Sequence, residues 1–554
     1  MIFSRWQSAL TSLRTSAAPA SGPAASALRL SAWALLLIGV ASRLSPLFDT
    51  DNRLLWQFMS EDGYLMQTIA RNMALGLGMS SSAGTIPTNG VQPLATFVFA
   101  ALHWLAGGSK TGGVALITLL SLAVSMAAAW FLYRVAARVF AGFANGRGMA
   151  LLCALIWFAA PRVVGHSMNG LETGIYYLAI LITLDFYQRY TTADAPLTWR
   201  HRLVLGVWLG IAFLARNDAV FFIGGLLIAH GLMGGSRVGG GLLHRCIDAV
   251  VCGLISLVVA SPWLAHNHAL FGSIVPISGI SESHGAALGS NLSALPANFF
   301  EASFSDLLLP LRLKLAAPVV AVTAVLVLAS LAGFWMVVAR HSLQAARFFV
   351  TGVLFAAAVS IYYGVFFGAA HFIPRYTSPL SVFMWTGTVA VVVVAMHAAF
   401  RSAPAARAGL ASVALLATAA SLAFAVSGFT KGTTNGHRQV VDWVRGHVPD
   451  DVWVGAVQTG TVGYFHDRTI NLDGKVNPAA LRAVIDHGSV LDYVVNSKID
   501  YIADWSGVGG WIDMREASPR FTSEFELLLR DEASNLSAMR RIHPKTVPQT
   551  AALK

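Results

Sequence analysis

The sequence predicts a mostly α-helical, polytopic membrane protein of about eleven spans, with a small α/β domain at its C-terminal end. Of the 554 residues, 55% are hydrophobic and only 12% are charged, whereas soluble domains carry roughly 25% charged residues. The mean hydropathy is +0.62. From about residue 430 onward the chain is more polar and alternates between helix-like and strand-like patterns.

The charge distribution gives the orientation of the spans. The net charge of +11 comes from arginines that stand in short clusters between apolar runs. This is the positive-inside pattern of cytoplasmic loops and not a basic face, so no nucleic-acid partner is expected. The pattern places the N-terminus inside and the C-terminal tail outside. The three cysteines lie in or next to spans, so no disulfide framework is implied.

The first elements are a leader, a span and a long loop. Residues 1–29 are rich in Ala, Ser and Pro and are expected to form a disordered cytoplasmic leader, not a cleaved signal peptide, because further spans follow. The first span is expected at 30–48, and an external loop at 49–111. Within this loop, residues 93–106 are apolar but too short to cross a membrane. We therefore expect them to lie along the membrane or dip into it.

The remaining spans follow from the apolar runs between the Arg clusters. They are predicted near 112–134, 148–162, 172–188, 203–216, 219–234, 247–264, 315–339, 346–368, 377–399 and 408–429. Together, residues 30–429 form the membrane module.

The tail, residues 430–554, is predicted to be an external α/β domain. Residues 440–448 and 478–486 have the pattern of helices, and the second run follows an Asn-Pro start. Residues 452–457 and 499–505 are rich in β-branched and aromatic residues and are expected to form strands. A unit of roughly 100 residues is large enough to bury a core of its own.

An acidic stretch in the external loop is the strongest site candidate. Leu65, Ile69 and Met73 recur every four residues, so residues 61–75 are expected to form a helix that begins with Glu61 and Asp62. Carboxylates beside a bilayer are costly and are functional candidates by default. The structural alternative is that Ser60 or Asp62 is simply the N-cap of this helix.

Three more polar clusters are predicted on the external face. His166 to Thr173 form a turn that carries Asn169 and Glu172. Arg216, Asn217 and Asp218 form a second tight turn, in which Arg216 could merely pair with Asp218. The third cluster, His371 to Tyr376, contains Arg375. Arginines on the unfavoured side of a membrane suggest an anionic partner, which could equally be a protein carboxylate or a lipid headgroup.

Glycosyl transfer from a lipid phosphate is a chemistry that uses such residues. The leaving phosphate needs cations and not a general acid, and the acceptor hydroxyl needs one carboxylate as a base. Direct attack opposite the leaving group inverts the anomeric centre. The sequence contains no P-loop, no His-Glu-x-x-His and no Gly-x-Ser-x-Gly motif, which argues against nucleotide-driven, zinc-protease and serine-hydrolase chemistry.

The sequence also resembles a known superfamily along most of its length. The matching stretches are SEDGYLMQTIARNMALGLG, TNGVQPL, SMNGLETGIYYLAILI, GIAFLARNDAVFFIGGLL, ALFGSIVPIS and, in the tail, VGAVQTGTVGYFHDRTINLDGKVN. In this order they resemble the C-type (GT-C) superfamily of polyprenyl-phosphate-sugar glycosyltransferases. In particular they resemble the terminal arabinofuranosyltransferases of bacterial envelopes and related pilin and lipid A sugar transferases.

The resemblance implies that Asp62, with Glu61 beside it, provides the catalytic acid of the first loop. The family often has two adjacent Asp residues, so the presence of Glu61 leaves open which carboxylate is the base. The sequence demands no cofactor, although a divalent cation would be compatible with Glu61 and Asp62, because hard cations favour carboxylate oxygen.

The prediction is therefore an inverting glycosyltransferase in the cytoplasmic (inner) membrane of a bacterium. It would move a sugar from a polyprenyl-phosphate donor to an envelope glycan, lipid or protein on the external face. Arg375, Arg216 and Arg71 are expected to bind the donor phosphate. Glu172, Asn169, Asp218 and His371 are expected to bind substrate. The alternative function is a transporter or flippase of a lipid-linked or small polar solute, although the acids gather at one face and no inverted repeat is evident.

Overall fold

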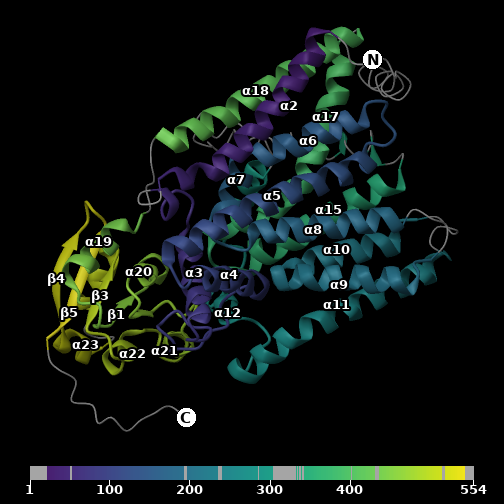
Figure 1. Ribbon diagram of the computed structural model, residues 1–554. Helices are drawn as coiled ribbons and strands as arrows, with labels where there is room; N and C mark the ends of the chain where they lie inside the picture. The colour runs from purple at the N-terminus through teal and green to yellow at the C-terminus, as the bar shows by residue number, and fades with distance from the viewer. Residues whose placement is uncertain are drawn as a thin grey trace.

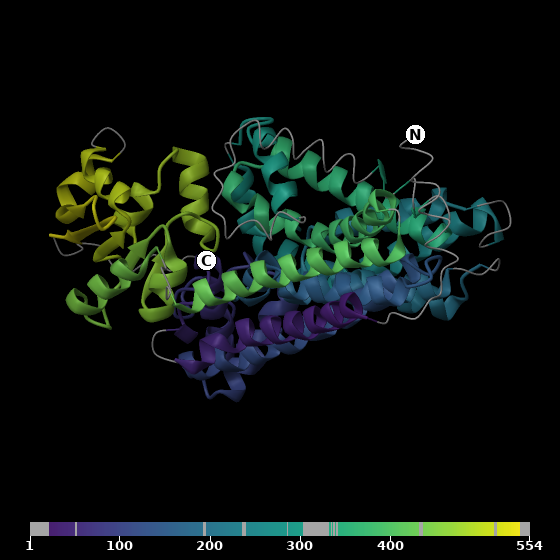
Figure 2. The same cartoon turned by 90° about the horizontal axis from the view of Figure 1, so that it is seen from above.

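The computed structural model shows a long bundle of helices with a smaller sheet-containing domain at one end (Figure 1). Seen from above, the tail domain again lies at one end of the bundle (Figure 2). The structure describes residues 22–49, 53–191, 196–234, 240–284, 286–302, 332–333, 335, 338–339, 342–400, 402–430, 436–514 and 518–542.

The membrane module is built from α-helices of very different lengths. Its main described helices are α2 (Pro23–Leu44), α3 (Glu61–Ala74), α4 (Pro93–Leu105), α5 (Lys110–Val139), α6 (Gly146–Ala159), α7 (Pro161–Met168), α8 (Thr173–Tyr190), α9 (Trp199–Ala215), α10 (Ala219–Leu232), α11 (Leu242–Phe271), α12 (Ile277–Ser283), α13 (Leu295–Glu301), α15 (Leu343–Ile361), α16 (Ile373–Thr377), α17 (Ser381–Ala399) and α18 (Ala403–Thr430). Short 3₁₀ or π turns join some of them, and the π turn η7 (Tyr362–Phe366) follows α15 directly.

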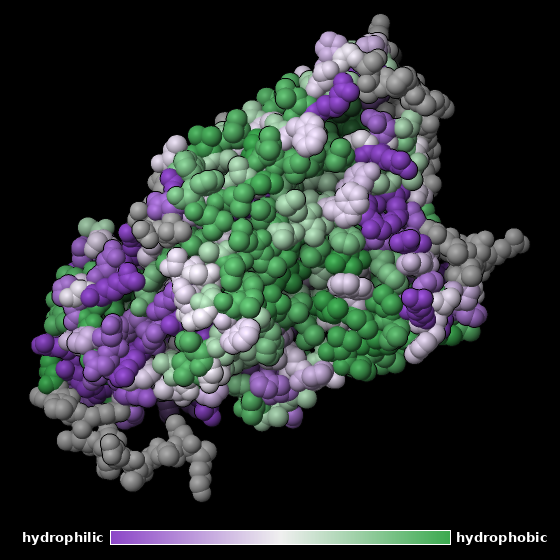
Figure 3. All heavy atoms as spheres, viewed as in Figure 1, coloured by the Kyte–Doolittle hydropathy of each residue, from purple (hydrophilic) through white to green (hydrophobic). Residues whose placement is uncertain are grey.

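The polytopic character predicted from composition is confirmed. Within the described residues, six helices are long and apolar enough to cross a membrane, or seven if one bent pair counts as a single span. The face of the bundle seen in Figure 3 is largely apolar along its middle, while polar residues gather over the tail domain and at the opposite end of the bundle. The predicted span 315–339 falls almost entirely outside the described residues, and the total of eleven spans stays a prediction.

Two boundaries differ from those expected. Helix α2 begins at Pro23, before the expected start at residue 30, because the residues after Pro23 are mostly good helix formers and proline suits the first helical turn. The span expected at 148–162 is instead the pair α6 and α7, bent by 57°. Pro161 disfavours the helical conformation at Ala160, which is extended. Helix α7 therefore reaches Met168, and the turn expected at 166–173 begins only after it.

The external-loop helix was predicted correctly. Helix α3 covers the expected 61–75 almost fully, and the Ser60 side chain caps it by accepting a hydrogen bond from the Gly63 backbone (3.0 Å). The short apolar segment in the same loop is α4, which packs on α3 and α5. Whether α4 crosses the membrane stays open to a topology experiment.

The tail domain contains a mixed five-stranded sheet. Its elements are α19 (Arg438–His447), β1 (Val454–Ala456), α20 (Thr459–Phe465), β2 (Thr469–Asn471), α21 (Pro478–His487), α22 (Leu491–Asn496), β3 (Tyr501–Asp504), α23 (Pro519–Glu524), β4 (Phe525–Asp531) and β5 (Leu536–Arg541). The strand order is β2-β1-β3-β5-β4, parallel from β2 to β3 and antiparallel beyond. The two helices and two strands expected from the sequence correspond to α19, α21, β1 and β3.

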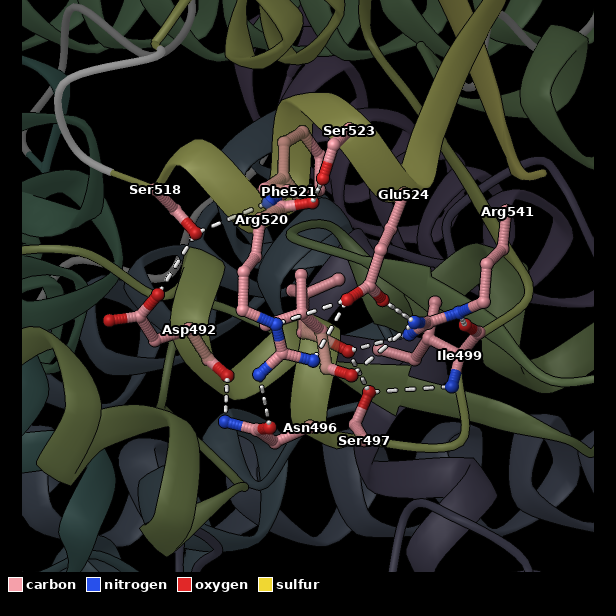
Figure 4. A network of polar contacts seen from close by, with 12 residues as sticks. Asp492, Asn496, Ser497, Ile499, Ser518, Arg520, Phe521, Ser523, Glu524 and Arg541 are labelled. Carbon is pink, nitrogen blue, oxygen red and sulfur yellow. Dashed lines mark hydrogen bonds and ion pairs between the residues drawn. The ribbon is translucent and has the colours of Figure 1, made fainter. Parts of the chain in front are cut away.

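A network of hydrogen bonds and ion pairs connects several elements within the tail domain (Figure 4). Glu524 pairs with both Arg520 (2.8 Å) and Arg541. Arg541 also donates to the backbone oxygens of Ile499 and Val494. These contacts join the end of α23 to β5 and to the chain leading into β3, beside a buried apolar core of the domain. These contacts hold the helices and strands of the tail domain together, so the domain can keep one of its loops in a fixed position.

Candidate functional site

A cavity of about 480 Å³ lies where the membrane module meets the tail domain. Four carboxylates line it, contributed by α3, the start of α8, the start of α10 and α12: Asp62, Glu172, Asp218 and Glu282. Three cations line it as well: Arg216, Arg375 and Lys475. The cavity therefore gathers charge from segments that are more than 400 residues apart.

Asp62 and Arg375 form the central ion pair of the cavity. Arg375 donates from Nη1 to the Asp62 carboxylate at 2.7 Å. Both side chains keep some exposure, 25% for Asp62 and 19% for Arg375. Nη2 of Arg375 lies 3.4 Å from the Tyr376 hydroxyl, and its Nε is buried with no hydrogen-bond partner among the described residues. The hydrogen-bonding capacity of this guanidinium is therefore not fully used within the described part of the chain.

Arg216 is almost fully buried behind this pair, with 1% exposure. Its Nε lies 3.2 Å from Asp218 and 3.6 Å from Glu172. Its Nη1 donates to the backbone oxygen of Arg375 at 3.2 Å. The pairing of Arg216 with Asp218, expected as the structural alternative, is present, and it also fixes the backbone that carries Arg375.

An aromatic wall supports the charged groups. Tyr363, in the π turn η7, stacks on Tyr376 at 4.0 Å between ring centroids and with 7° between the ring planes. Its hydroxyl donates to Asp218 at 2.9 Å. The Arg216 guanidinium lies 4.7 Å from the centre of the Tyr376 ring. Aromatic faces and carboxylates thus hold both arginines in fixed positions.

Much of the rest of the cavity lining is apolar, and we call this part the apolar wall. It is formed by residues of α3, α9, α10 and α11 and of the chain after α11, among them Leu65, Met66, Phe213, Val220, Phe221, Leu264, Ile274 and Val275. A charged end joined to an apolar wall suits an amphipathic molecule with an anionic head.

Glu61 faces a different partner from its neighbour. The backbone N–H of Thr461 donates to both of its carboxylate oxygens (3.0 Å each), and the Thr461 hydroxyl donates to it as well. Burial raises the pKa of Glu61 from 4.5 to about 7, although the Thr461 hydrogen bonds lower it. Glu61 is therefore engaged by the tail domain and is not part of the described cavity lining.

The contact around Glu61 is close and continues along α3. We call it the docking interface, and it consists of α3 and the start of α5 against α20 and Asp467 of the tail. A Cβ atom on Gly460 would lie 1.8 Å from the Glu61 backbone oxygen, so only glycine fits there. Asp467 pairs with Arg71 (3.2 Å) and Lys110 (2.9 Å) at the other end. Trp56 and Phe465 stack beside it at 4.8 Å.

Three other predicted site residues lie outside the described cavity lining. Arg71 belongs to the docking interface, where it pairs with Asp467 and donates to the Gly108 backbone oxygen (2.7 Å). The Asn169 backbone oxygen accepts from the Ser60 backbone N–H (3.2 Å) and hydroxyl (3.1 Å), so this residue fixes the start of α3. His371 is exposed, and its ring lies against Phe372.

The sequence had not singled out Lys475 or Tyr363 as site residues. Lys475 and Glu282 pair at 2.7 Å in the cavity. Lys475 lies within the tail stretch that resembles other members of the superfamily, which was the available signal. Tyr363 had no signal of its own, because tyrosine near a span end is common at membrane surfaces.

A divalent cation shared by Glu61 and Asp62 stays a prediction, and in the structure the two carboxylates contact different partners. Glu61 accepts hydrogen bonds from Thr461, whereas Asp62 accepts from Arg375. Within the described residues, no group of three or more His, Cys, Asp or Glu side chains could hold a metal ion.

Comparison with known proteins gives a fold match along nearly the whole chain. Residues 428–541 match a family model described as a domain of unknown function (DUF8728). A search of curated protein sequences gives no significant match. The crystal structure of ArnT from Cupriavidus metallidurans bound to undecaprenyl phosphate has a TM-score of 0.57 and 14% identity, covering 94% of this chain and 99% of that chain. The apo structure of the same protein has a TM-score of 0.59 and 14% identity, covering 92% and 98%.

The archaeal oligosaccharyltransferase AglB from Archaeoglobus fulgidus, in complex with an inhibitory peptide and a dolichol-phosphate, is also similar. Its TM-score is 0.55 at 14% identity, covering 91% of this chain and 72% of that chain. The chain thus has the fold of the C-type (GT-C) glycosyltransferases, a multi-pass helical membrane module followed by a small C-terminal domain. The resemblance indicated by the sequence motifs is confirmed at the level of the fold.

Proposed function

We propose that this protein is an inverting glycosyltransferase that moves a sugar from a polyprenyl-phosphate donor to an envelope glycan, lipid or protein. The observation that carries the proposal is the cavity in which Asp62 meets Arg375 beside an apolar wall. The fold adds support, because similar structures hold undecaprenyl phosphate and a dolichol-phosphate. We also infer that the site opens at the membrane face where the tail domain lies. We infer that this is the external face of a bacterial cytoplasmic membrane.

In this proposal Asp62 is the general base. The acceptor oxygen attacks the anomeric carbon and loses its proton to the Asp62 carboxylate. The bond between the anomeric carbon and the phosphate oxygen breaks, and its electron pair leaves on the phosphate. Attack opposite the leaving group inverts the anomeric centre. Asp62 is preferred over Glu61 because Asp62 lines the cavity while Glu61 accepts hydrogen bonds from Thr461.

The arginines stabilise the leaving group in this proposal. Both arginines line the cavity, and among the described residues the buried Nε of Arg375 and Nη2 of Arg216 have no hydrogen-bond partner. A guanidinium can hold two phosphate oxygens at once, and such charge-assisted bonds strengthen as negative charge develops. The lipid tail of the donor would lie along the apolar wall formed by α9, α10 and α11.

The test is a transfer assay with purified protein and a panel of polyprenyl-phosphate sugars. The wild type should release polyprenyl phosphate in the presence of acceptor. Asp62→Asn should lower turnover about 10²- to 10⁴-fold, the usual contribution of a general base, while still binding the lipid phosphate. Glu61→Gln, which changes the neighbouring carboxylate, tests the other candidate base. If Asp62→Asn keeps normal turnover and Glu61→Gln does not, the base is Glu61. If lipid-linked sugar crosses a vesicle membrane without being cleaved, the protein is a transporter instead.

A further inference from the structure

A short turn of the tail domain enters the cavity from outside the membrane module. It follows β2, and Gly474 adopts a left-handed conformation (φ +81°) at its centre. The Gly474 N–H donates to the Asn471 side chain at 3.0 Å, and the Asn477 side chain donates to the Asn471 backbone oxygen at 2.7 Å. Asn477 also caps α21. The turn is therefore held internally from both sides, and Lys475 projects from a fixed backbone.

The membrane module packs closely against this turn. A Cβ atom on Gly90 would lie 2.1 Å from the Lys475 backbone oxygen, so these two segments are in direct backbone contact. Val476 is fully buried in one apolar cluster with Ile69 and Trp263. The Ser281 hydroxyl donates to the Asp473 backbone oxygen at 3.0 Å, which joins the turn to α12. The position of the Lys475 side chain is thus set by the docking of the tail.

Among the described residues, Lys475 does not use all of its hydrogen-bond donors. Its Nζ lies 2.7 Å from Glu282 and 3.7 Å from Asp473, so only the first distance is that of a hydrogen bond. An ammonium group carries three donors. Burial alone lowers the pKa of Lys475, but the carboxylates of Asp473, Asp62 and Glu282 raise it above its usual range, so the group stays charged.

Lys475 and Arg375 both lie near the ring of Phe372. Nζ of Lys475 lies 4.8 Å from the centre of the Phe372 ring, and the guanidinium carbon of Arg375 lies 5.2 Å from the same centre. Asp62 interacts electrostatically with both cations. Both cations line the same cavity, so a phosphate bound in it meets positive charge from two different domains.

We infer that Lys475 is a ligand of the donor phosphate, and that the tail domain completes the substrate site by supplying it. The inference rests on the proposed function and deepens it. It assigns a specific task to residues 428–541, which match a family model described as a domain of unknown function. The membrane module supplies the base and two arginines, and the tail supplies the third cation.

The competing explanation is that Lys475 only tethers α12 through Glu282. The two explanations predict opposite effects of Glu282→Gln. For a tether, Glu282→Gln and Lys475→Gln break the same pair and should do equal harm. For a phosphate ligand, Glu282→Gln removes a competing anion, so phosphate affinity should be unchanged or higher, while Lys475→Gln should lower it.

The experiment measures binding of a short-chain polyprenyl phosphate, and of the uncharged polyprenol of the same length, to full-length protein in detergent. We expect Lys475→Gln to weaken polyprenyl phosphate binding about ten-fold or more, the loss typical of a bond between charged groups. Polyprenol binding should not change. Lys475→Arg should retain most of the affinity. Lys498→Gln, an exposed tail lysine over the Trp453 ring, is the matched control.

The outcomes separate the inference from the proposed function. Wild-type affinity in Lys475→Gln, or an equal loss in Glu282→Gln, would overturn the role of Lys475 and leave the glycosyltransferase proposal standing. Wild-type protein that binds polyprenyl phosphate no better than polyprenol would count against the proposed function itself. Asp62→Asn should still bind polyprenyl phosphate, because it removes a base and not a cation.

Discussion

Gly460 offers a way to move the tail domain without touching any charged group of the cavity. Its Cα lies against the backbone of Glu61, and an added Cβ would lie 1.8 Å from the Glu61 backbone oxygen and 2.8 Å from its carboxylate Oε1. Real Cβ atoms essentially never approach within 3.0 Å. Gly460→Ala must therefore widen the docking interface by at least the difference, 1.2 Å.

The expected consequences follow from that displacement. Forcing an extra methyl group into a packed contact costs about 1–3 kcal/mol, so docking should weaken by this amount. The turn that carries Lys475 belongs to the same domain and should shift with it. Misplacing a binding group by about 1 Å can cost on the order of 10²-fold in rate. We expect Gly460→Ala to lower both turnover and polyprenyl phosphate affinity, although every cavity side chain is intact.

Gly463→Ala is the control on the same helix. A Cβ atom there would lie 3.6 Å from Thr469, which is ordinary van der Waals contact. Alanine in a helix interior is about 0.5–1 kcal/mol better than glycine. This variant should therefore be as active as the wild type. The assay is polyprenyl phosphate binding together with limited proteolysis of the tail. Wild-type affinity and protection in Gly460→Ala would refute the claim that close docking positions the site.

Two further predictions concern Arg375 and Glu61. Arg375→Lys should reduce donor affinity and turnover almost as much as Arg375→Ala, because an ammonium cannot reproduce the planar fork that contacts Asp62 and could hold two phosphate oxygens at once. Near-complete rescue by lysine would instead indicate a purely structural pairing with Asp62. For Glu61, the pKa raised to about 7 means that the docked state keeps its proton where the undocked state has lost it. Docking should be strongest below pH 4.5 and weaken up to about pH 7, and Glu61→Gln should abolish this slope in a proteolysis series from pH 4 to 8. The same slope in both proteins would contradict the assignment.

Local patterns carried most of the fold prediction. The four-residue recurrence of Leu65, Ile69 and Met73 gave the helix α3, and the apolar runs between Arg clusters gave the helices of the module. These features depend on residues close in sequence. The bend at Pro161 was missed, although proline is a local signal, because an apolar run of the right length was interpreted as one straight span.

The site was only half predictable, since it is built from distant segments. Asp62, Glu172, Arg216, Asp218 and Arg375 were each recognised from sequence, and all five line the cavity. The pairing of Arg216 with Asp218 was anticipated from sequence, but the pairing of Asp62 with Arg375 was not, because these two residues are 313 positions apart. The partner of Glu61 is 400 residues away, and Lys475 enters through docking of a separate domain. Position along the chain carries no information on such contacts.

The two adjacent carboxylates show how helix geometry can divide tasks between neighbours. Successive residues of an α-helix point about 100° apart, because a turn holds 3.6 residues. Glu61 and Asp62, in the first turn of α3, therefore cannot face the same partner. One contacts the tail through Thr461, and the other contacts Arg375 in the cavity. Because both belong to one rigid turn capped by Ser60, any shift of the tail against Glu61 is transmitted to Asp62. Two adjacent acids need not act together: here Glu61 contacts the tail domain, and Asp62 lines the cavity.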